Sequence, residues 1–306
     1  MNRAPLLRRL SSTVVLATVL CVGCVSTQTP AITDASRLPK GQAAPPKVHR
    51  FEHVFTIVLE NQDYGDVIKD HNLGPLALSG ASFTDFHGLF HPSYDNYLAM
   101  VSGRLIETHG DKQVKLDFVT IGDRLVTQGR TWKNYAEGYP GQPGQCFLAD
   151  GHDRYARKHV PFLSFVQVQK SGCANVVPDT QLAEDLQAGN LPTYAFYSPD
   201  LDDDGHDPTS DPPKGLAKAS AWLKKFREDH AFPHDTLVVV TFDESKGTGA
   251  ANQIYTVFLG DMVTPGCKVA MVSNHLNVLR TIEDNFGLEP LADGDGNARP
   301  ITECWK

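Results

Sequence analysis

Three groups of acidic residues could bind a cation, and each comes directly after a short apolar segment. The groups are Glu60-Asn61, Asp202-Asp203-Asp204-Gly205-His206-Asp207 and Asp243-Glu244, after residues 55–59, 193–197 and 236–241. Adjacent carboxylates at the end of a buried strand repel one another unless a positive charge lies between them. Carboxylate oxygens and imidazole nitrogens are common metal ligands, so these groups predict a metal-binding site.

Each group also has a plainer interpretation. Asp243-Glu244 would fit a solvated strand end with a helix N-cap, and Asn61 would fit a helix cap. Residues 202–207 would fit an exposed acidic loop or a structural calcium loop, although they lack the glycine and glutamate spacing of an EF-hand. The location of all three groups after strands favours a shared site.

Ser93 is the candidate nucleophile. A serine hydroxyl is weakly nucleophilic at neutral pH and needs a neighbouring base or metal ion. No GxSxG motif surrounds Ser93, which argues against an α/β-hydrolase. Without the acidic groups, residues 92–93 would be interpreted as a turn before a helix over residues 97–102.

Two histidines join the candidates. His275 opens a predicted helix and, with Asp202 and His206, would complete an Asp/His/His set suited to zinc or iron. His159 could donate a hydrogen bond to a phosphate oxygen. The plainer interpretations are a structural histidine at a helix start and a surface histidine.

Alternating strands and helices predict an α/β sandwich around a mainly parallel sheet. Residues 55–59 and 236–241 are apolar and β-branched, as expected of buried strands, and 193–197 and 254–259 are weaker strands. Apolar residues recur on one face over residues 213–230 and 275–286, which predicts two helices. Sites in such sheets form at the carboxyl ends of strands, so we expect the three acidic groups to converge.

Composition and the N-terminus indicate an exported globular protein. The chain has 306 residues, a 41% hydrophobic fraction and a formal net charge of -8, and the lack of a basic run argues against nucleic-acid binding. Arg3, Arg8 and Arg9 precede an uncharged stretch, which predicts a signal peptide over residues 1–24. Cys24 could be the lipidated residue of a lipoprotein, and ordinary signal cleavage fits nearly as well.

We therefore expect a flexible linker over residues 25–49 and a catalytic domain over residues 50–306. The location would be periplasmic, secreted or membrane-anchored. Four cysteines remain after Cys24, and an even count in an oxidising compartment predicts two disulfides. Of the three possible connectivities, proximity favours Cys146–Cys173 with Cys267–Cys304.

Six motifs occur in an order that resembles a known family. They are IVLEN (57–61), HPSYDNYLAMVSG (91–103), YARKHVPF (155–162), SPDLDDDGHD (198–207), VTFDE (240–244) and HLNVLRTIE (275–283). The chain, from about residue 51 to residue 305, resembles the phosphoesterase family of bacterial phospholipases C and secreted acid phosphatases. It looks most similar to short secreted acid phosphatases that act on phosphatidylinositol 3-phosphate. The resemblance implies an alkaline-phosphatase-like three-layer sandwich.

The resemblance also implies residue roles. A metal that activates the serine would be surrounded by Glu60, Asn61, Ser93, Asp243 and Glu244. A second metal or the phosphoryl oxygens would be bound by Asp202, Asp204, His206 and His275. Asn96 would donate a hydrogen bond to phosphate, as His159 and His206 could. Asp95 and Asp200 depart from the family pattern of Pro and Asn, and Asp95 beside the phosphate would repel an anionic ester.

We thus predict an acid phosphatase that forms a phosphoserine and uses one or two divalent metal ions per chain. Oxygen-rich ligands suit Ca²⁺, Mg²⁺ or Mn²⁺, whereas paired histidines suit zinc or iron. The substrate would be a small-molecule or phospholipid phosphate ester. The alternatives are a phospholipase C-type phosphodiesterase and a non-enzymatic calcium-binding lipoprotein. A sulfatase is disfavoured because no Cys/Ser-x-Pro-x-Arg motif surrounds Ser93.

Overall fold

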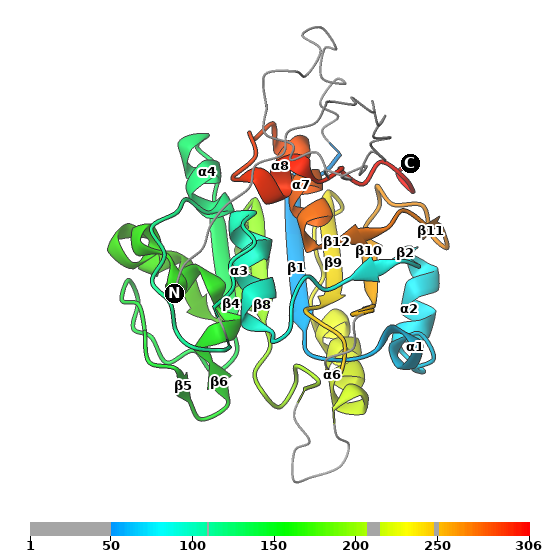
Figure 1. Ribbon diagram of the computed structural model, residues 1–306, viewed down its shortest axis with the longest axis horizontal. Helices are drawn as coiled ribbons and strands as arrows, with labels where there is room; N and C mark the ends of the chain where they lie inside the picture. The colour runs from blue at the N-terminus through cyan, green and yellow to red at the C-terminus, as the bar shows by residue number, and fades with distance from the viewer. Residues whose placement is uncertain (1–49, 109, 207–214, 248–250) are drawn as a thin grey trace, which may run out of the picture. The chain divides into compact units, whose positions relative to one another are not determined.

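The central element of the fold is an eight-stranded sheet with the order β11-β2-β10-β9-β1-β8-β4-β7 (Figure 1). The structure is a computed structural model that describes residues 50–108, 110–206, 215–247 and 251–306, all within the unit Pro45–Lys306. The strands are β1 (His53–Leu59), β2 (Ala81–Phe83), β4 (Trp132–Ala136), β7 (Val176–Pro178), β8 (Tyr194–Ser198), β9 (Thr236–Phe242), β10 (Thr256–Leu259) and β11 (Lys268–Val269).

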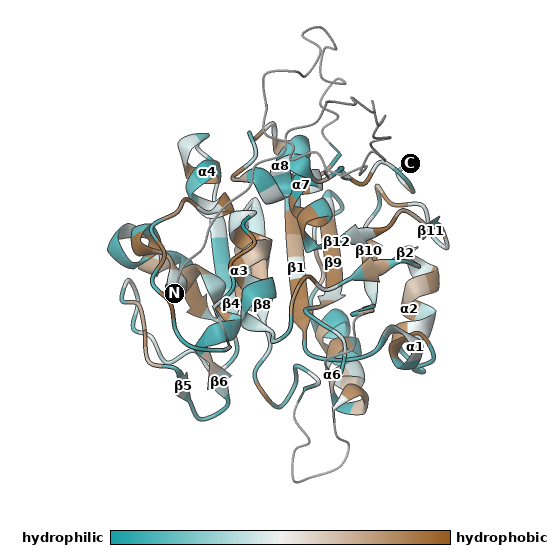
Figure 2. Ribbon diagram, in the orientation of Figure 1, coloured by the Kyte–Doolittle hydropathy of each residue, from teal (hydrophilic) through white to brown (hydrophobic). Residues whose placement is uncertain are grey.

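The sheet is mostly parallel, as predicted. Strands β9, β1, β8, β4 and β7 are parallel to one another, whereas β10 pairs antiparallel with both β9 and β2. Two small sheets join β3 (Phe86–His87) to β12 (Ser273–Asn274) and β5 (Gly151–His152) to β6 (Tyr155–Ala156). β1 and β9 are strongly apolar (Figure 2), because each lies between two other strands and is covered on both faces.

Helices cover both faces of the sheet, which makes three layers. The helices are α1 (Tyr64–Val67), α2 (Leu73–Ser79), α3 (Tyr94–Ser102), α4 (Ile121–Thr127), α5 (Gln181–Ala188), α6 (Leu216–Asp229), α7 (His275–Phe286) and α8 (Asp293–Asn297). On β1, Phe55 packs against Phe226 of α6, whereas the next residue, Thr56, lies with Met100 of α3 and Leu279 of α7 around a small cavity. Successive strand residues point to opposite faces, so α6 covers one face and α3 and α7 the other.

The predicted helices are present, and the ends of two of them differ from the prediction. α7 covers the predicted residues; Asn274 forms a capping box at its start, and Gly287, whose φ is 69°, caps its end. α6 begins at Leu216; residues 213 and 214 of the prediction lie outside the described residues. α3 begins at Tyr94, three residues before the prediction, directly after Ser93.

The pairing register of the strands brings the acidic groups to one edge of the sheet. Leu59 of β1 pairs with Phe242 of β9, so Glu60 and Asp243 leave the sheet side by side. The backbone N–H of Asp243 donates to the Leu59 carbonyl at 2.9 Å, and that of Glu60 donates to the Asp204 carbonyl at 2.8 Å. The segments that follow β9, β1 and β8 are therefore adjacent.

Both predicted disulfides are present, Cys146–Cys173 and Cys267–Cys304. The second joins the segment after β10 to the last residues of the chain. In the described ranges, helices are all too short or too polar to cross a membrane. The predicted signal peptide, the linker and Cys24 lie outside the described residues.

Candidate active site

The Ser93 hydroxyl is surrounded by oxygen acceptors from two other segments. Its Oγ lies 3.0 Å from Glu60 Oε2, 3.0 Å from Glu244 Oε1 and 3.3 Å from Asn61 Oδ1. Ser93 immediately precedes α3 and is only 2% exposed. A hydroxyl has one proton to donate, so it can satisfy only one of the three acceptors at a time. Two carboxylates and an amide oxygen around one hydroxyl make a ligand set that a cation would complete.

Asp243 adds a third carboxylate to this group. The Asn61 backbone N–H donates to Asp243 Oδ1 at 3.1 Å, whereas Asp243 Oδ2 is buried and has no hydrogen-bond partner in the described ranges. Burial, together with the charges of Glu60 and Glu244, raises the pKa of Asp243 well above its usual value. An orphaned carboxylate oxygen among mutually repelling carboxylates fits a divalent cation at this position.

His159 is a buried histidine beside Glu60. Its Nε2 lies 3.0 Å from Glu60 Oε1, its Nδ1 lies 3.7 Å from Asp204 Oδ2, and its ring stacks on Tyr97 with centroids 5.1 Å apart. Although burial raises the pKa of Glu60, the opposing effect of His159 is the main reason that it falls to about 2. Glu60 therefore stays ionised. Contact with phosphate remains a prediction for His159, which is 2% exposed.

His91 is a site residue that the sequence reasoning missed. Its Nδ1 is in direct contact with Glu244 Oε2, while the other Glu244 oxygen accepts from Ser93 and, at 3.2 Å, from Asn61 Nδ2. His91 lies two residues before Ser93, and this position in the HPS segment is the only sequence signal for it. Both oxygens of Glu244 are thus engaged.

Asn96 and His275 contact backbone groups of the site segments. Asn96 Oδ1 accepts from the N–H groups of Leu89 and Phe90 at 2.8 and 3.0 Å, and its Nδ2 donates to the Phe90 carbonyl at 3.0 Å. His275 Nε2 lies 2.7 Å from the Asp243 carbonyl oxygen, and burial lowers the pKa of this histidine to about 4. Neither contact involves a side chain of the group around Ser93. Phosphate binding by Asn96 and metal binding by His275 remain predictions.

The remaining predicted residues lie in the loop after β8. Asp202 forms an ion pair with Arg154 at 3.0 Å and lies 3.6 Å from Lys218. His206 is exposed, and its backbone N–H donates to Asp204 Oδ1 at 2.9 Å. Asp207 lies outside the described residues. The loop therefore reaches the group around Ser93 through Asp204, which contacts His159.

The Asp95 carboxylate is hydrogen-bonded to Thr108, and its repulsion of an anionic ester stays a prediction. The carboxylate accepts from the Thr108 N–H at 3.0 Å and from the Thr108 hydroxyl at 2.6 Å. Burial raises its pKa above the usual range. The contacts anchor the segment after α3, which accounts for an acidic residue two positions from Ser93.

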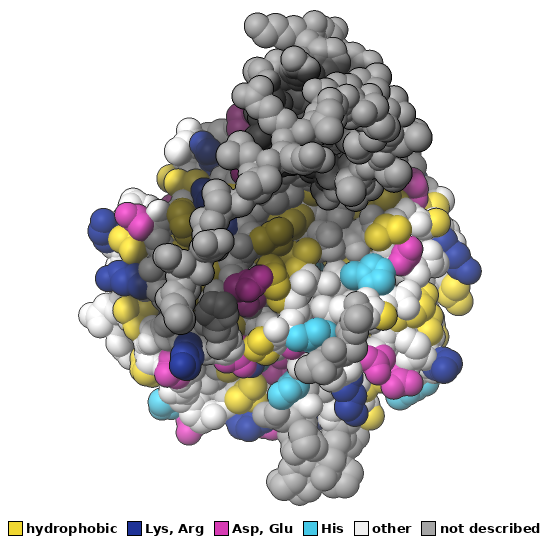
Figure 3. Space-filling view, viewed as in Figure 1, with side chains coloured by type: hydrophobic (Ala, Val, Ile, Leu, Met, Phe, Trp, Pro, Cys, Tyr) yellow, Lys and Arg dark blue, Asp and Glu magenta, His cyan; other side chains and the backbone are white. Residues whose placement is uncertain are grey.

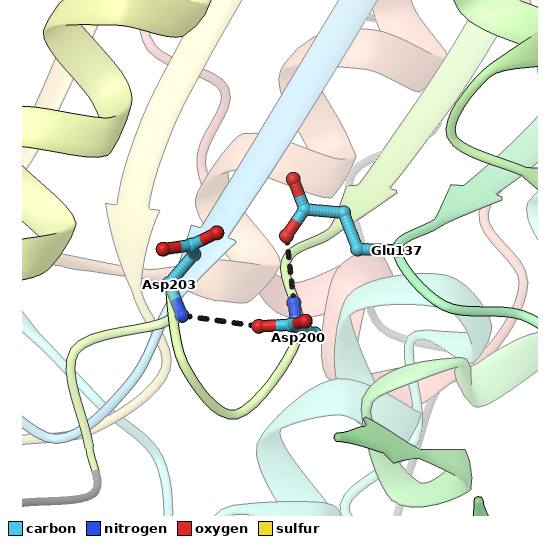
Figure 4. A group of neighbouring side chains, drawn as sticks. All are labelled: Glu137, Asp200 and Asp203. Carbon is cyan, nitrogen blue, oxygen red and sulfur yellow. Dashed lines mark hydrogen bonds between the residues drawn. The ribbon is translucent and has the colours of Figure 1, made fainter. Parts of the chain in front are cut away.

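A second acidic cluster lies after β4 and β8 (Figure 4). Glu137, Asp200 and Asp203 each offer a ligand oxygen, and these oxygens lie within 4.8 Å of one another, so the cluster could hold a cation. Glu137 Oε1 already accepts from Tyr197 Oη and Trp222 Nε1, both at 2.9 Å. Burial raises the pKa of Glu137 to about 7. The sequence analysis did not identify Glu137, because a single glutamate after a strand does not predict a site.

One face of the molecule carries both acidic and histidine side chains. Figure 3 shows both kinds interspersed on the lower part of the face, with Lys and Arg scattered rather than clustered over its described part.

Comparison with solved structures identifies the fold, and a family model identifies the family. A Vibrio parahaemolyticus protein of the alkaline phosphatase superfamily aligns with 88% of this chain and 74% of its own, with a TM-score of 0.61 and 16% identity. The protein thus has the alkaline-phosphatase-superfamily fold. Within it, the chain belongs to the phosphoesterase family, which it matches over residues 73–289.

Relatives of this chain include proteins named as phosphatases. A Mycobacterium tuberculosis phosphatidylinositol-3-phosphatase is 34% identical over 263 residues, which is 83% of each chain. An Aspergillus fumigatus acid phosphatase is 30% identical over 259 residues, covering 81% of this chain. This chain spans only 58% of that relative's length and 62% of the length of a Kluyveromyces lactis relative.

Proposed function

We propose that this protein is a phosphatase that hydrolyses phosphomonoesters with Ser93 as its nucleophile. The observation that carries the proposal is the Ser93 hydroxyl, 3.0 Å from carboxylate oxygens of both Glu60 and Glu244. Membership of the phosphoesterase family and relatives named as acid phosphatases support the reaction class.

The proposed reaction has two steps. Ser93 Oγ attacks phosphorus, a bond forms between them, and the ester oxygen leaves with a proton as the free alcohol. Water then attacks phosphorus, the bond to Ser93 Oγ breaks, and inorganic phosphate leaves while the serine oxygen regains a proton. Glu244 is the better acceptor for the Ser93 proton, because burial raises the pKa of Glu244 whereas that of Glu60 falls to about 2.

Catalysis in this site requires positive charge, since Glu60, Asp243 and Glu244 would repel an anionic ester. A divalent cation would be held by Glu60, Asn61, Ser93, Asp243 and Glu244, and would stabilise charge on the serine oxygen and the phosphoryl oxygens. The orphaned Asp243 Oδ2 supports this assignment. A second cation site at Asp202, Asp204, His206 and His275 rests on the resemblance alone.

A substrate panel tests the function. Purified protein is assayed with p-nitrophenyl phosphate, bis(p-nitrophenyl) phosphate and phosphatidylinositol 3-phosphate, with Ser93→Ala as the matched control. Preferential, Ser93-dependent hydrolysis of the monoesters supports the proposal. Preference for the diester would favour a phospholipase C-type enzyme. No turnover at all, with cation binding retained, would favour a binding protein. Activity on the lipid would extend the substrate class to phosphoinositides, as the name of the mycobacterial relative suggests.

Export is proposed on independent grounds. The basic and apolar N-terminal residues, the two disulfides and the cysteine at position 24 support a periplasmic, secreted or lipid-anchored protein. Mass analysis of the mature N-terminus distinguishes cleavage alone from lipidation of Cys24.

A further inference from the structure

The site depends on two loops that lie far apart in the chain. One loop, residues 88–93, carries His91 and Ser93. The other, residues 243–245, carries Asp243 and Glu244. The reacting geometry between Ser93 and Glu244 therefore depends on how these loops are held relative to each other.

Asn252 forms hydrogen bonds to both loops. Its Oδ1 accepts from the Ser245 backbone N–H at 2.8 Å, and its Nδ2 donates to the Phe90 carbonyl at 3.1 Å. Its own backbone carbonyl accepts from the Gly88 N–H at 2.8 Å. One side-chain amide thus joins the residue after Glu244 to a residue three positions before Ser93.

The local backbone is adapted to this contact. Asn252 has a φ of 40°, a left-handed conformation that asparagine tolerates better than most residues, and its side chain is 8% exposed. A Cβ atom at Gly88 would lie 2.6 Å from Asn252 Nδ2 and 2.9 Å from the Asp243 carbonyl oxygen. Glycine at position 88 therefore allows the loops to approach the amide closely.

Asn96 completes the support of the nucleophile loop. Its Nδ2 donates to the same Phe90 carbonyl that accepts from Asn252, and its Oδ1 accepts from two N–H groups of the loop. Asn96 holds the nucleophile loop only to α3, whereas Asn252 holds it to the carboxylate loop. Loss of Asn252 would leave the Ser245 N–H, in a buried residue, without its acceptor.

We infer that Asn252 is a positioning residue that sets the separation of Ser93 and Glu244, and this inference rests on the proposed function of that pair. Asn252 does not contact the Ser93 hydroxyl; it acts through the backbone of both loops. Since misplacement of reacting groups by about 1 Å can cost about 10²-fold in rate, its loss should be visible in kcat.

Asn252→Gly tests the inference, because glycine keeps the left-handed backbone and removes both side-chain hydrogen bonds. The matched control is Asn285→Ala, which removes a buried amide that joins α7 to the N–H and carbonyl of Phe51. Both variants and the wild type are assayed with p-nitrophenyl phosphate at a temperature where each is folded, and Tm is measured for each.

We expect kcat of Asn252→Gly to fall about 10- to 100-fold, with KM within about threefold, whereas Asn285→Ala lowers Tm and keeps kcat within about twofold. A kcat of Asn252→Gly close to that of the wild type, or an equal fall in Asn285→Ala, would overturn the inference. An inactive wild type would instead refute the proposed function. In that case a crystal structure of Asn252→Gly tests the positioning role separately. An unchanged distance between Ser93 and Glu244 would overturn the role, and a longer distance would support it.

Discussion

The hydroxyl oxygen of Ser93 lies 3.0 Å from Oε1 of Glu244, although 151 residues separate the two in the chain. The same hydroxyl is equally close to Glu60, so one proton is shared among acceptors from two other loops. This arrangement is suited to removing the serine proton, and it underlies the first two predictions.

Ser93→Ala should abolish the proposed reaction. Removal of the hydroxyl eliminates the atom that would bond to phosphorus, so kcat/KM should fall by about 10³-fold or more. Steady-state assays with p-nitrophenyl phosphate, together with circular dichroism to verify folding, provide the measurement. A folded variant with near-native turnover would exclude Ser93 as the nucleophile.

Removal of divalent cations should inactivate the protein and destabilise it. The carboxylates of Glu60, Asp243 and Glu244 repel one another without a cation, and one buried Asp243 oxygen has no hydrogen-bond partner among the described residues. We expect exhaustive chelation to lower kcat by about 10²-fold or more and one added divalent metal to restore both kcat and Tm.

Asp243→Asn is the control for that experiment. It keeps the shape of the side chain but removes one charge, so restoration should require a higher concentration of the same metal. Full activity after chelation, verified by elemental analysis, would remove metal from the mechanism.

Stability should fall as pH rises because of Glu283 on α7. Burial, reinforced by the neighbouring Asp295 of α8, raises the pKa of Glu283 from 4.5 to about 10. Between these values the folded protein holds a proton that the unfolded chain releases, so this group destabilises the fold increasingly as pH rises from 4.5 toward 10. The effect is at most about 1.4 kcal/mol per pH unit.

Glu283→Gln should remove this dependence, since the amide is neutral at every pH. Urea unfolding at pH 5 and pH 8 measures the pH dependence of the free energy of unfolding. The variant should be more stable than the wild type at pH 8 but not at pH 5. Parallel pH profiles for the two proteins would contradict the assignment.

The Cys267–Cys304 disulfide should stabilise the fold without affecting the reaction. It closes a loop with a sequence separation of 37, for which chain entropy gives roughly 3–4 kcal/mol. The double variant Cys267→Ser/Cys304→Ser should therefore unfold at lower urea and keep kcat when folded, because neither cysteine contacts the group around Ser93. A large fall in kcat at full folding would show that the C-terminal segment supports the site.

Several features could be predicted from the sequence because their signals are local. The apolar residues of β1 and β9 predict buried strands, the spacing in α7 predicts a helix, and two cysteine pairs close in sequence predict the observed disulfides. The placement of acidic residues after strands also indicated one edge of a parallel sheet, since strand ends of that kind meet at a common edge.

The contacts of individual side chains required the tertiary structure. The strand order β9-β1-β8 decides which acidic groups are neighbours, and the register of Leu59 with Phe242 decides that Glu60 lies beside Asp243. No local pattern predicts that His91 contacts Glu244 or that Asn252 joins two loops. The sequence by itself determined the strongly apolar strands β1 and β9, the helix α7 and most of the candidate ligands around Ser93. Only the packing of those elements decided which ligand faces Ser93, because such contacts depend on long-range strand pairing.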